Sequence, residues 1–318
     1  MFVSVVLSFH DEKRYIQKCL RSLFELDYPK DLYEIIVVAD GCDIEGMEII
    51  KKIVSSPPVK TILLTQEDKG PAAGRNLGIK ASRGEVIAIT DPDCIVDEGW
   101  LKNHVKHYND PKVGGVEGKV ETEWDELCFP KKIAPVGYRY ATCNMSYRRK
   151  ALEEVRFFDE DFRFKEDDDL AYRVIEKGWR IVEESAALVY HPVRNLDLKN
   201  LIKRALKSKY DVLLYKKHPE LATKTLHVKK IGSIAFTPES KYSTIMLMVF
   251  IALLLSLMLN FFIITLGIII ILTILYVYLS KKLLKRRPPL SVFWMLIDIF
   301  FIEVSRIYGS IKYRKFLL

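Results

Sequence analysis

The sequence predicts an α/β fold with a mostly parallel sheet flanked by helices, followed by membrane-associated helices. Short, almost continuously apolar runs alternate with amphipathic stretches through the first third of the chain, as in parallel sheets covered on both faces. Residues 242–280 contain no charged residue, which predicts membrane insertion. The 318 residues suffice for one large domain and an appendage.

Strands and helices are expected to alternate up to residue 90. Apolar, β-branched runs predict strands at 2–7, 33–39, 59–64 and 86–89. Apolar residues at helical spacing predict helices at 16–24 and 44–54. A third helix is expected from Pro71, which suits a first helical position, to a point before Gly84.

Polar and acidic side chains follow three of these strands. They are His10 and Glu12, then Asp40, then Asp91 and Asp93. Ligands bind beyond the carboxyl ends of the strands in open α/β sheets, so these groups are expected to share one crevice. Asp91 and Asp93 are two residues apart in an extended segment and can face one point, which suits a divalent ion that also holds phosphate. A solvated Asp-Pro-Asp turn is the alternative.

Residues 69–79 suggest a phosphate cradle. Small residues let the start of a helix approach another group closely, and Lys69 and Arg75 add positive charge. The alternative is a helix closely packed under the sheet.

The region from 96 to 195 is less regular. Expected elements are a helix at 100–108, strands at 113–122 and 138–147, a helix at 166–177, and a pair of strands at 180–183 and 187–190. The helix at 166 begins with Glu166, Asp167, Asp168 and Asp169. These acids either cap the helix or include a general base with a raised pKa. His191 is either structural or a metal or phosphate contact.

The C-terminal part predicts membrane contact. Residues 197–217 form a basic amphipathic helix, and basic residues flank 242–280 on both sides. Because a single helix over 242–280 would be about twice the thickness of a bilayer core, a hairpin with both ends on the cytoplasmic side is expected. Residues 290–311 carry Asp298, Glu303 and Arg306, so a helix that lies in the interface or packs under the catalytic domain is favoured over a third pass.

The charge and the cysteine content of the chain exclude some classes of binding partner and site. The net charge is +8 and the pI about 9.0, but the basic residues cluster beside the membrane segments, which argues against nucleic-acid binding. Five cysteines without a Cys-x-x-Cys pair indicate neither a zinc site nor a disulfide framework.

The order of motifs resembles family 2 glycosyltransferases, which are inverting enzymes with a GT-A fold. The resemblance covers about residues 3 to 195. The turn at 8–12 lacks the family's Pro and Tyr, and Gly74 stands where Ala is common. The segments that carry the resemblance are 8–12, 38–41, 69–78, 83–93 with Trp100-Leu101, 144–149, 158–160, and 166–170 with Arg173 and Gly178.

The resemblance implies roles for these residues. Asp40, with His10 and Glu12, would hold the nucleotide base and ribose, and Asp91 would lie near the ribose. Ser8, Lys69 and Arg75 would also be on the donor side. Asp93 would hold Mg²⁺ or Mn²⁺, with Asp91 and His191 as further candidate ligands. Asp167, with Asp168 as the second choice, would take the proton from the acceptor hydroxyl. On the acceptor side the resemblance places Asn144, Glu166 and Arg204.

The expected protein is a membrane-anchored, metal-dependent, inverting glycosyltransferase. The Gln-x-x-Arg-Trp motif of processive synthases is absent around 201–205, which favours transfer of a single sugar. The expected partners are a nucleotide-diphosphate sugar, a lipid-linked saccharide or polyprenyl phosphate acceptor, and membrane lipids. The expected location is the cell membrane, multi-pass, with the catalytic domain in the cytoplasm. A sugar nucleotidyltransferase and an inactive membrane scaffold are the alternatives.

These inferences give a domain plan. The predicted parts are a catalytic domain at 1–195 (donor half 1–95, acceptor half 96–195), a basic interfacial helix and linker at 196–235, a transmembrane hairpin at 242–280, and a last helix with a basic tail at 288–318.

Overall fold

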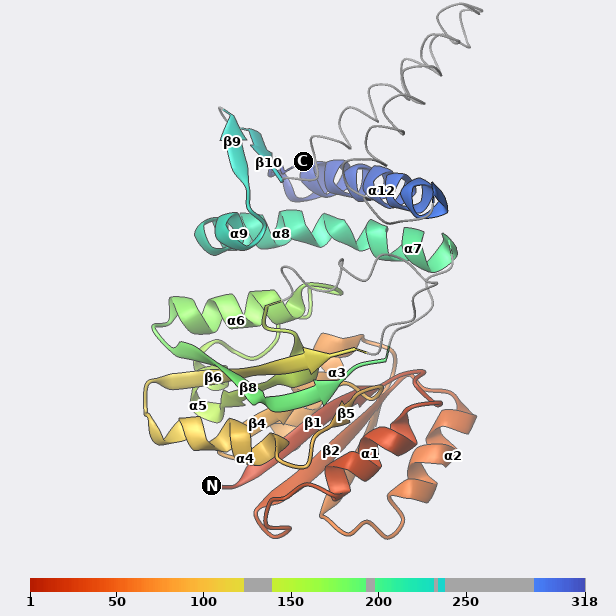
Figure 1. Ribbon diagram of the computed structural model, residues 1–318, viewed down its shortest axis with the longest axis vertical. Coiled ribbons are helices and arrows are strands. Elements are labelled where there is room, and N and C mark those ends of the chain that lie inside the picture. Colours follow the sequence, from red (N-terminus) through yellow and green to blue (C-terminus); the bar gives the residue numbers. More distant parts are fainter. Residues whose placement is uncertain (123–138, 193–197, 232–233, 238–288, 318) are drawn as a thin grey trace, which may run out of the picture. The chain divides into compact units, whose positions relative to one another are not determined.

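A computed structural model describes residues 1–122, 139–192, 198–231, 234–237 and 289–317 (Figure 1). The chain forms two compact units. The first unit comprises Met1–Asp125 and Tyr138–Arg194, and the second comprises Glu126–Gly137 and Asn195–Leu318.

The described part of the first unit contains an eight-stranded sheet in the order β3-β2-β1-β4-β7-β6-β8-β5. The strands are β1 (Val3–Phe9), β2 (Tyr33–Asp40), β3 (Thr61–Gln66), β4 (Val86–Ile89), β5 (Ile95–Val96), β6 (Val113–Glu121), β7 (Met145–Arg148) and β8 (Arg180–Tyr190). The helices are α1 (Ile16–Phe24), α2 (Ile44–Ile53), α3 (Pro71–Ala81), α4 (Trp100–Val105), α5 (Arg149–Glu154) and α6 (Glu166–Glu176), with 3-10 turns at Lys106–Asn109 and Thr142–Asn144.

The predicted α/β fold is confirmed, but the sheet is mixed. Strands β3, β2, β1 and β4 run parallel, whereas β7 pairs antiparallel with both β4 and β6, and β5 pairs antiparallel with β8. The carboxyl ends of β1, β2 and β4 therefore meet at one edge of the sheet, as the strand order of a doubly wound sheet requires.

Two predictions for the second half of the sheet were wrong. Residues 180–183 and 187–190 belong to one continuous strand, β8, whose register against β6 shifts between Glu184 and Leu188. That irregularity explains why the apolar pattern is interrupted there. Of the described residues 139–147 in the predicted strand, only those from Met145 onward form a strand, because 142–144 form a 3-10 turn.

The core of the first unit follows from the apolar strands. Every residue of β2 is buried, and β1 is buried except for the partly exposed Ser8. Helix α3 lies close to these strands because it lacks bulk: a Cβ on Gly78 would lie 2.6 Å from Val6. A buried polar pair also forms where Ser4 Oγ donates to Glu34 over 2.9 Å.

The described part of the second unit is mainly helical. Its elements are α7 (Leu198–Ala205), a 3-10 turn (Leu206–Ser208), α8 (Lys209–Lys217), α9 (Pro219–Thr225), β9 (Lys229–Ile231), β10 (Ile234–Phe236) and α12 (Pro289–Tyr313). The single helix expected at 197–217 is thus interrupted by the 3-10 turn. Helix α12 packs along α7 and α8 (Figure 1).

Ion pairs explain two charged residues of α12, Asp298 and Arg306. Arg204 of α7 donates to Asp298 over 2.7 Å, and Arg306 pairs with Asp211 of α8 at 3.0 Å. The expectation that 290–311 lies in the membrane interface or under the catalytic domain stays a prediction. In the described ranges, none of the helices is both long and apolar enough to span a bilayer. The hairpin predicted at 242–280 lies outside the described residues.

Candidate active site

The ends of β1 and β2 bring the first predicted donor residues together. The two strands pair in parallel up to Phe9 and Ala39, so His10 and Asp40 follow side by side. The His10 ring donates from Nδ1 to the Asp40 carbonyl over 2.7 Å, and this bond raises the pKa of His10. The Glu12 carboxylate folds back to accept from the His10 N–H at 3.1 Å.

The Asp40 carboxylate is held from the neighbouring strand and from the start of α3. It accepts from Gln66 Nε2 over 2.7 Å and from the Lys69 N–H over 2.9 Å, and the residue is 2% exposed. Lys69 acts here through its backbone, while its side chain is exposed. Gly74 leaves room for Ser8, because a Cβ at position 74 would lie 2.2 Å from Ser8 Oγ. This contact explains why glycine replaces the alanine that is common there.

Arg75 lies between two acids. Its Nη2 is 2.9 Å from Asp91 and its Nη1 is 2.7 Å from Glu166, while the guanidinium stacks over the Phe158 ring at 5.6 Å. Arg75 is 5% exposed. These contacts link the Asp91 turn to the start of α6, so Arg75 connects the two regions. Direct contact of Arg75 with a nucleotide-sugar donor stays a prediction.

Asp93 and His191 meet through strand pairing. Ile95 of β5 pairs with Tyr190 of β8, which places the next residue, His191, beside the Asp93 turn. His191 Nε2 lies 3.7 Å from Asp93 Oδ1. The ligand atoms of Asp93, Cys94 and His191 all lie within 4.8 Å of one another. A carboxylate and an imidazole fit Mn²⁺, and the carboxylate also fits Mg²⁺. Asp91 faces Arg75 instead.

The four acids at the start of α6 have different partners. Glu166 pairs with Arg75, Asp168 with Lys165 at 2.9 Å, and Asp169 with Arg173 at 2.7 Å. Asp167 forms no ion pair among the described residues, although the nearby charge of Lys165 acts to lower its pKa. Its carboxylate accepts the Asp168 N–H over 2.9 Å. The run is therefore a set of three ion pairs around one carboxyl group.

The environment of Asp167 favours a proton acceptor. The carboxyl group is poorly hydrated, and this burial raises its pKa well above the ordinary value, with further contributions from the negative charges of Asp168 and Glu166. The residue keeps partial solvent exposure, so another molecule can reach it. A carboxylate with a raised pKa is a stronger general base than an ordinary aspartate.

Asn144 is buried at the end of the 3-10 turn that precedes β7. Its Oδ1 accepts from Trp100 Nε1 at 2.8 Å and from His104 Nε2 at 3.0 Å, and its Nδ2 donates to the carbonyls of Lys119 and Ala187. These bonds give it a structural role, and its contact with an acceptor stays a prediction. Arg204, also placed on the acceptor side, belongs to the second unit and pairs there with Asp298.

His104 is a buried titratable group that the sequence did not point to directly. Its place among apolar residues of the helix predicted at 100–108 is the signal that could have indicated its burial. Its Nε2–H donates to Asn144, and its Nδ1 accepts from Ser146 Oγ at 2.9 Å, a hydroxyl that in turn bonds Tyr108. Burial lowers the pKa of His104 to about 4.

This histidine predicts a pH-dependent stability. The unfolded chain binds a proton at His104 near its ordinary pKa, whereas the folded chain does not until about pH 4. The contribution of His104 to the free energy of unfolding is thus fully present above about pH 6.5. It is lost as the pH falls toward 4, which lowers the free energy of unfolding by up to about 3 kcal/mol. In urea unfolding at pH 7 and pH 5, His104→Gln is expected to lose less stability on acidification than the unsubstituted chain. Equal losses would contradict this account.

Comparison with known proteins identifies the class of enzyme. Residues 4–127 match the family described as Glycosyl transferase family 2. Glycosyltransferase AglE of Haloferax volcanii is 28% identical over 205 residues, covering 61% of this chain and 67% of that protein. The chain is a glycosyltransferase. A second relative, the dolichyl N-acetyl-alpha-D-glucosaminyl phosphate 3-beta-D-2,3-diacetamido-2,3-dideoxy-beta-D-glucuronosyltransferase of Methanococcus voltae, is 24% identical over 230 residues, covering 64% of this chain and 71% of that protein.

Solved structures agree with the fold of this glycosyltransferase. The mannosyltransferase PcManGT of Pyrobaculum calidifontis has a TM-score of 0.66 at 16% identity, over 97% of this chain and 87% of that one. Staphylococcus aureus TarS 1-349 has a TM-score of 0.52 at 20% identity, over 67% and 66%. The predicted enzyme class is confirmed, which disfavours the nucleotidyltransferase and scaffold alternatives.

Proposed function

We propose that the enzyme transfers one sugar, with inversion, from a nucleotide-diphosphate sugar to a hydroxyl of a lipid-linked acceptor. One observation carries this proposal: Asp167 is the acid of the 166–169 run without a described cationic partner, and it lies beside Glu166, which Arg75 links to the Asp91 turn. A base on one side and a diphosphate site on the other are the requirements of single displacement.

Asp93 and His191 are the proposed ligands of Mg²⁺ or Mn²⁺. The ion would neutralise the charge that develops on the departing nucleotide diphosphate. The PcManGT structure was solved with GDP-Man and Mn²⁺, which supports a metal-assisted reaction in a chain of this fold. Asp93 is 3% exposed, so the surrounding residues restrict the conformations open to its carboxylate.

His10, Glu12 and Asp40 are the proposed contacts for the nucleotide base and ribose, with Ser8 beside them. The bond from His10 to the Asp40 carbonyl orients the ring at the ends of β1 and β2. The TarS structure was solved with UDP, which supports a nucleoside diphosphate as the leaving group here.

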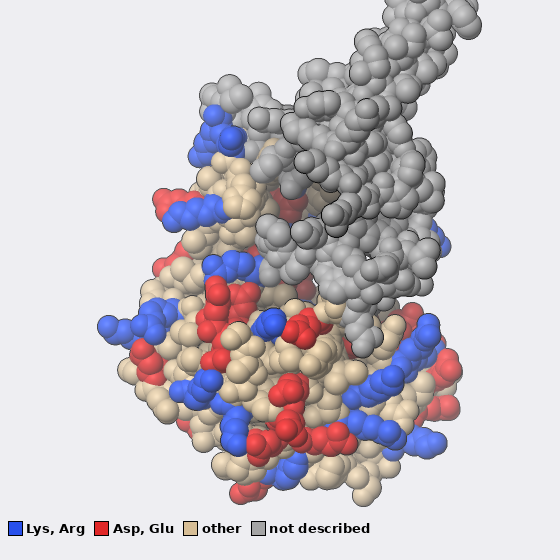
Figure 2. Space-filling model, in the orientation of Figure 1, with Lys and Arg blue, Asp and Glu red and all other residues tan. Residues whose placement is uncertain are grey.

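A lipid-linked acceptor and membrane attachment are proposed from the charge of the second unit. Its described acids Asp211, Asp298 and Glu303 are buried, which leaves Glu220 as the exposed acid of that part. Its exposed cations are Lys199, Lys203, Lys207, Lys216, Lys217, Lys224, Lys229, Lys230, Lys312 and Arg314. On the visible face of the first unit, by contrast, acids and bases are interspersed (Figure 2).

Such a cationic surface suits anionic lipid head groups. The dolichyl phosphate sugar named as the substrate of the Methanococcus voltae relative supports a polyprenyl-phosphate-linked acceptor. We therefore propose a membrane location with the catalytic unit in the cytoplasm.

The function is tested with detergent-solubilised protein. Common nucleotide sugars are supplied with Mn²⁺, with and without polyprenyl-phosphate-linked acceptors, and released nucleoside diphosphate is measured. We expect metal-dependent release that rises when the acceptor is present. If no nucleotide sugar gives metal-dependent release or transfer, the proposed reaction is rejected.

A further inference from the structure

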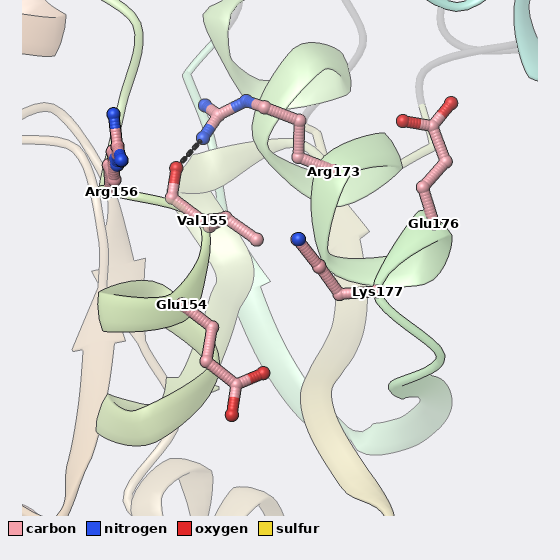
Figure 3. A pocket seen from close by; sticks show the side chains of 6 residues that line it. All are labelled: Glu154, Val155, Arg156, Arg173, Glu176 and Lys177. Atoms are coloured by element: carbon pink, nitrogen blue, oxygen red, sulfur yellow. Dashed lines mark hydrogen bonds between the residues drawn. The ribbon is translucent and has the colours of Figure 1, made fainter.

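Arg173 joins α6 to the segment that follows α5. Its Nε donates to Asp169 one turn earlier on α6 over 2.8 Å. Its Nη1 donates to the carbonyl oxygens of Val155 at 2.5 Å and Phe157 at 2.7 Å. Figure 3 shows the side chain of Arg173 reaching from α6 to Val155. A planar guanidinium can make all these bonds together, whereas a lysine ammonium cannot match the geometry.

The segment that Arg173 holds has an unfavourable backbone. Arg156 and Phe157 are consecutive non-glycine residues in the left-handed region, with φ of 61° and 64°. Each such residue costs about 1 kcal/mol or more, so the conformation needs support from outside the segment. Arg173 supplies it, because the two carbonyls that accept its hydrogen bonds belong to Val155 and Phe157, at either side of Arg156.

The same segment continues directly to the predicted donor side. Asn76 of α3 accepts the Phe158 N–H at 2.9 Å and donates to the Phe158 carbonyl at 3.0 Å. The Phe158 ring lies under Arg75, the residue before Asn76, and Arg75 returns to α6 through Glu166. These contacts form a closed ring from α6 through 155–158 and α3 back to α6.

We propose that Arg173 is a positioning residue for sugar transfer, because it closes this ring and holds Asp167 in place relative to the Asp91 turn. The proposal rests on the proposed function, in which Asp167 is the base. Glu166 and Asp169 flank Asp167 on one helix, and each is held by an arginine. Small displacements of a reacting group cost large factors in rate, about 100-fold for 1 Å.

Arg173 acts through these contacts and does not face the donor residues. It borders an open pocket of about 480 Å³, lined also by Glu154, Val155, Arg156, Glu176 and Lys177 (Figure 3). None of the predicted site residues lines this pocket, so a direct role for Arg173 in substrate binding is not indicated.

The test compares Arg173→Lys with Arg180→Lys, the same change at an exposed ion pair with Asp110. For Arg173→Lys we expect kcat to fall about 10- to 100-fold, with the donor Kd changed less than about threefold. A looser α6 would admit water to Asp167 and lower its pKa, so the acidic limb of the pH–kcat profile should move to lower pH. Arg180→Lys should change none of these. If Arg173→Lys lowers only the unfolding temperature, and kcat per folded molecule and the pH profile are unchanged, the proposal is overturned.

A second readout separates this proposal from the proposed function. The titration of Asp167 can be followed by carboxyl ¹³C NMR without any substrate. If the unsubstituted enzyme shows no transfer, the proposed function fails, but a lower Asp167 pKa in Arg173→Lys would still support the positioning role and an unchanged one would overturn it. If Arg173→Lys does not fold, Asp169→Asn replaces it. That change weakens the pairing between Arg173 and α6 but keeps the arginine, so smaller decreases in kcat and in the Asp167 pKa are expected.

Discussion

Replacing Asp167 with asparagine is expected to abolish sugar transfer while leaving donor binding largely intact. The amide has nearly the same shape but cannot take a proton from the acceptor hydroxyl, so kcat should fall by about 10² to 10⁴-fold. The Kd for the nucleotide sugar, measured by calorimetry, should change less than about threefold, because the proposed base and ribose contacts lie at the ends of β1 and β2 and Asp167 lies on α6.

Two variants make this result specific. Asp161→Asn removes an exposed carboxylate just before α6 and should leave kcat unchanged. Asp168→Asn tests the alternative base. Because Asp168 is committed to Lys165, its loss should reduce stability more than it reduces transfer. Full activity in Asp167→Asn would show that the base is assigned wrongly, and loss of transfer in Asp168→Asn alone would move the assignment to that residue.

Replacing Asp93 with asparagine is expected to remove the metal dependence of the reaction. The proposed ion stabilises developing charge by several kcal/mol, so its loss should lower kcat about 100-fold or more. Mn²⁺ affinity, measured by electron paramagnetic resonance in the presence of nucleoside diphosphate, should fall in parallel. His191→Gln is expected to weaken Mn²⁺ binding less, because its imidazole is the more exposed partner.

The control for the metal centre is Asp27→Asn, the same change of residue at an exposed ion pair with Lys102. It should leave Mn²⁺ affinity unchanged. If Asp93→Asn binds Mn²⁺ as tightly as the unsubstituted enzyme, Asp93 is not a ligand, and Asp91 becomes the next candidate.

Local sequence patterns determined the parallel half of the fold. Apolar β-branched runs predict β1 to β4 to within a few residues. Strands β1, β2 and β4 are buried on both sheet faces, so their sequences are almost continuously apolar. The same logic failed at 180–190, where the register shift in β8 interrupts the apolar pattern without ending the strand. It also failed at 138–147, because the buried residues of a 3-10 turn resemble a strand in composition.

The residue types of the site were also evident from the sequence, but their partners were not. The Asp-Pro-Asp turn, Asp40 and the acidic run stand at strand or helix ends that local patterns predict. Glu166 pairs with Arg75, more than 90 positions away, and His191 reaches Asp93 through the pairing of β5 with β8. Periodicity specifies which face of an element is buried, whereas these two long-range contacts depend on which distant elements pack together. The tertiary structure therefore decided that Asp167 is the acid without a described cation and that Arg75 bridges the two sides.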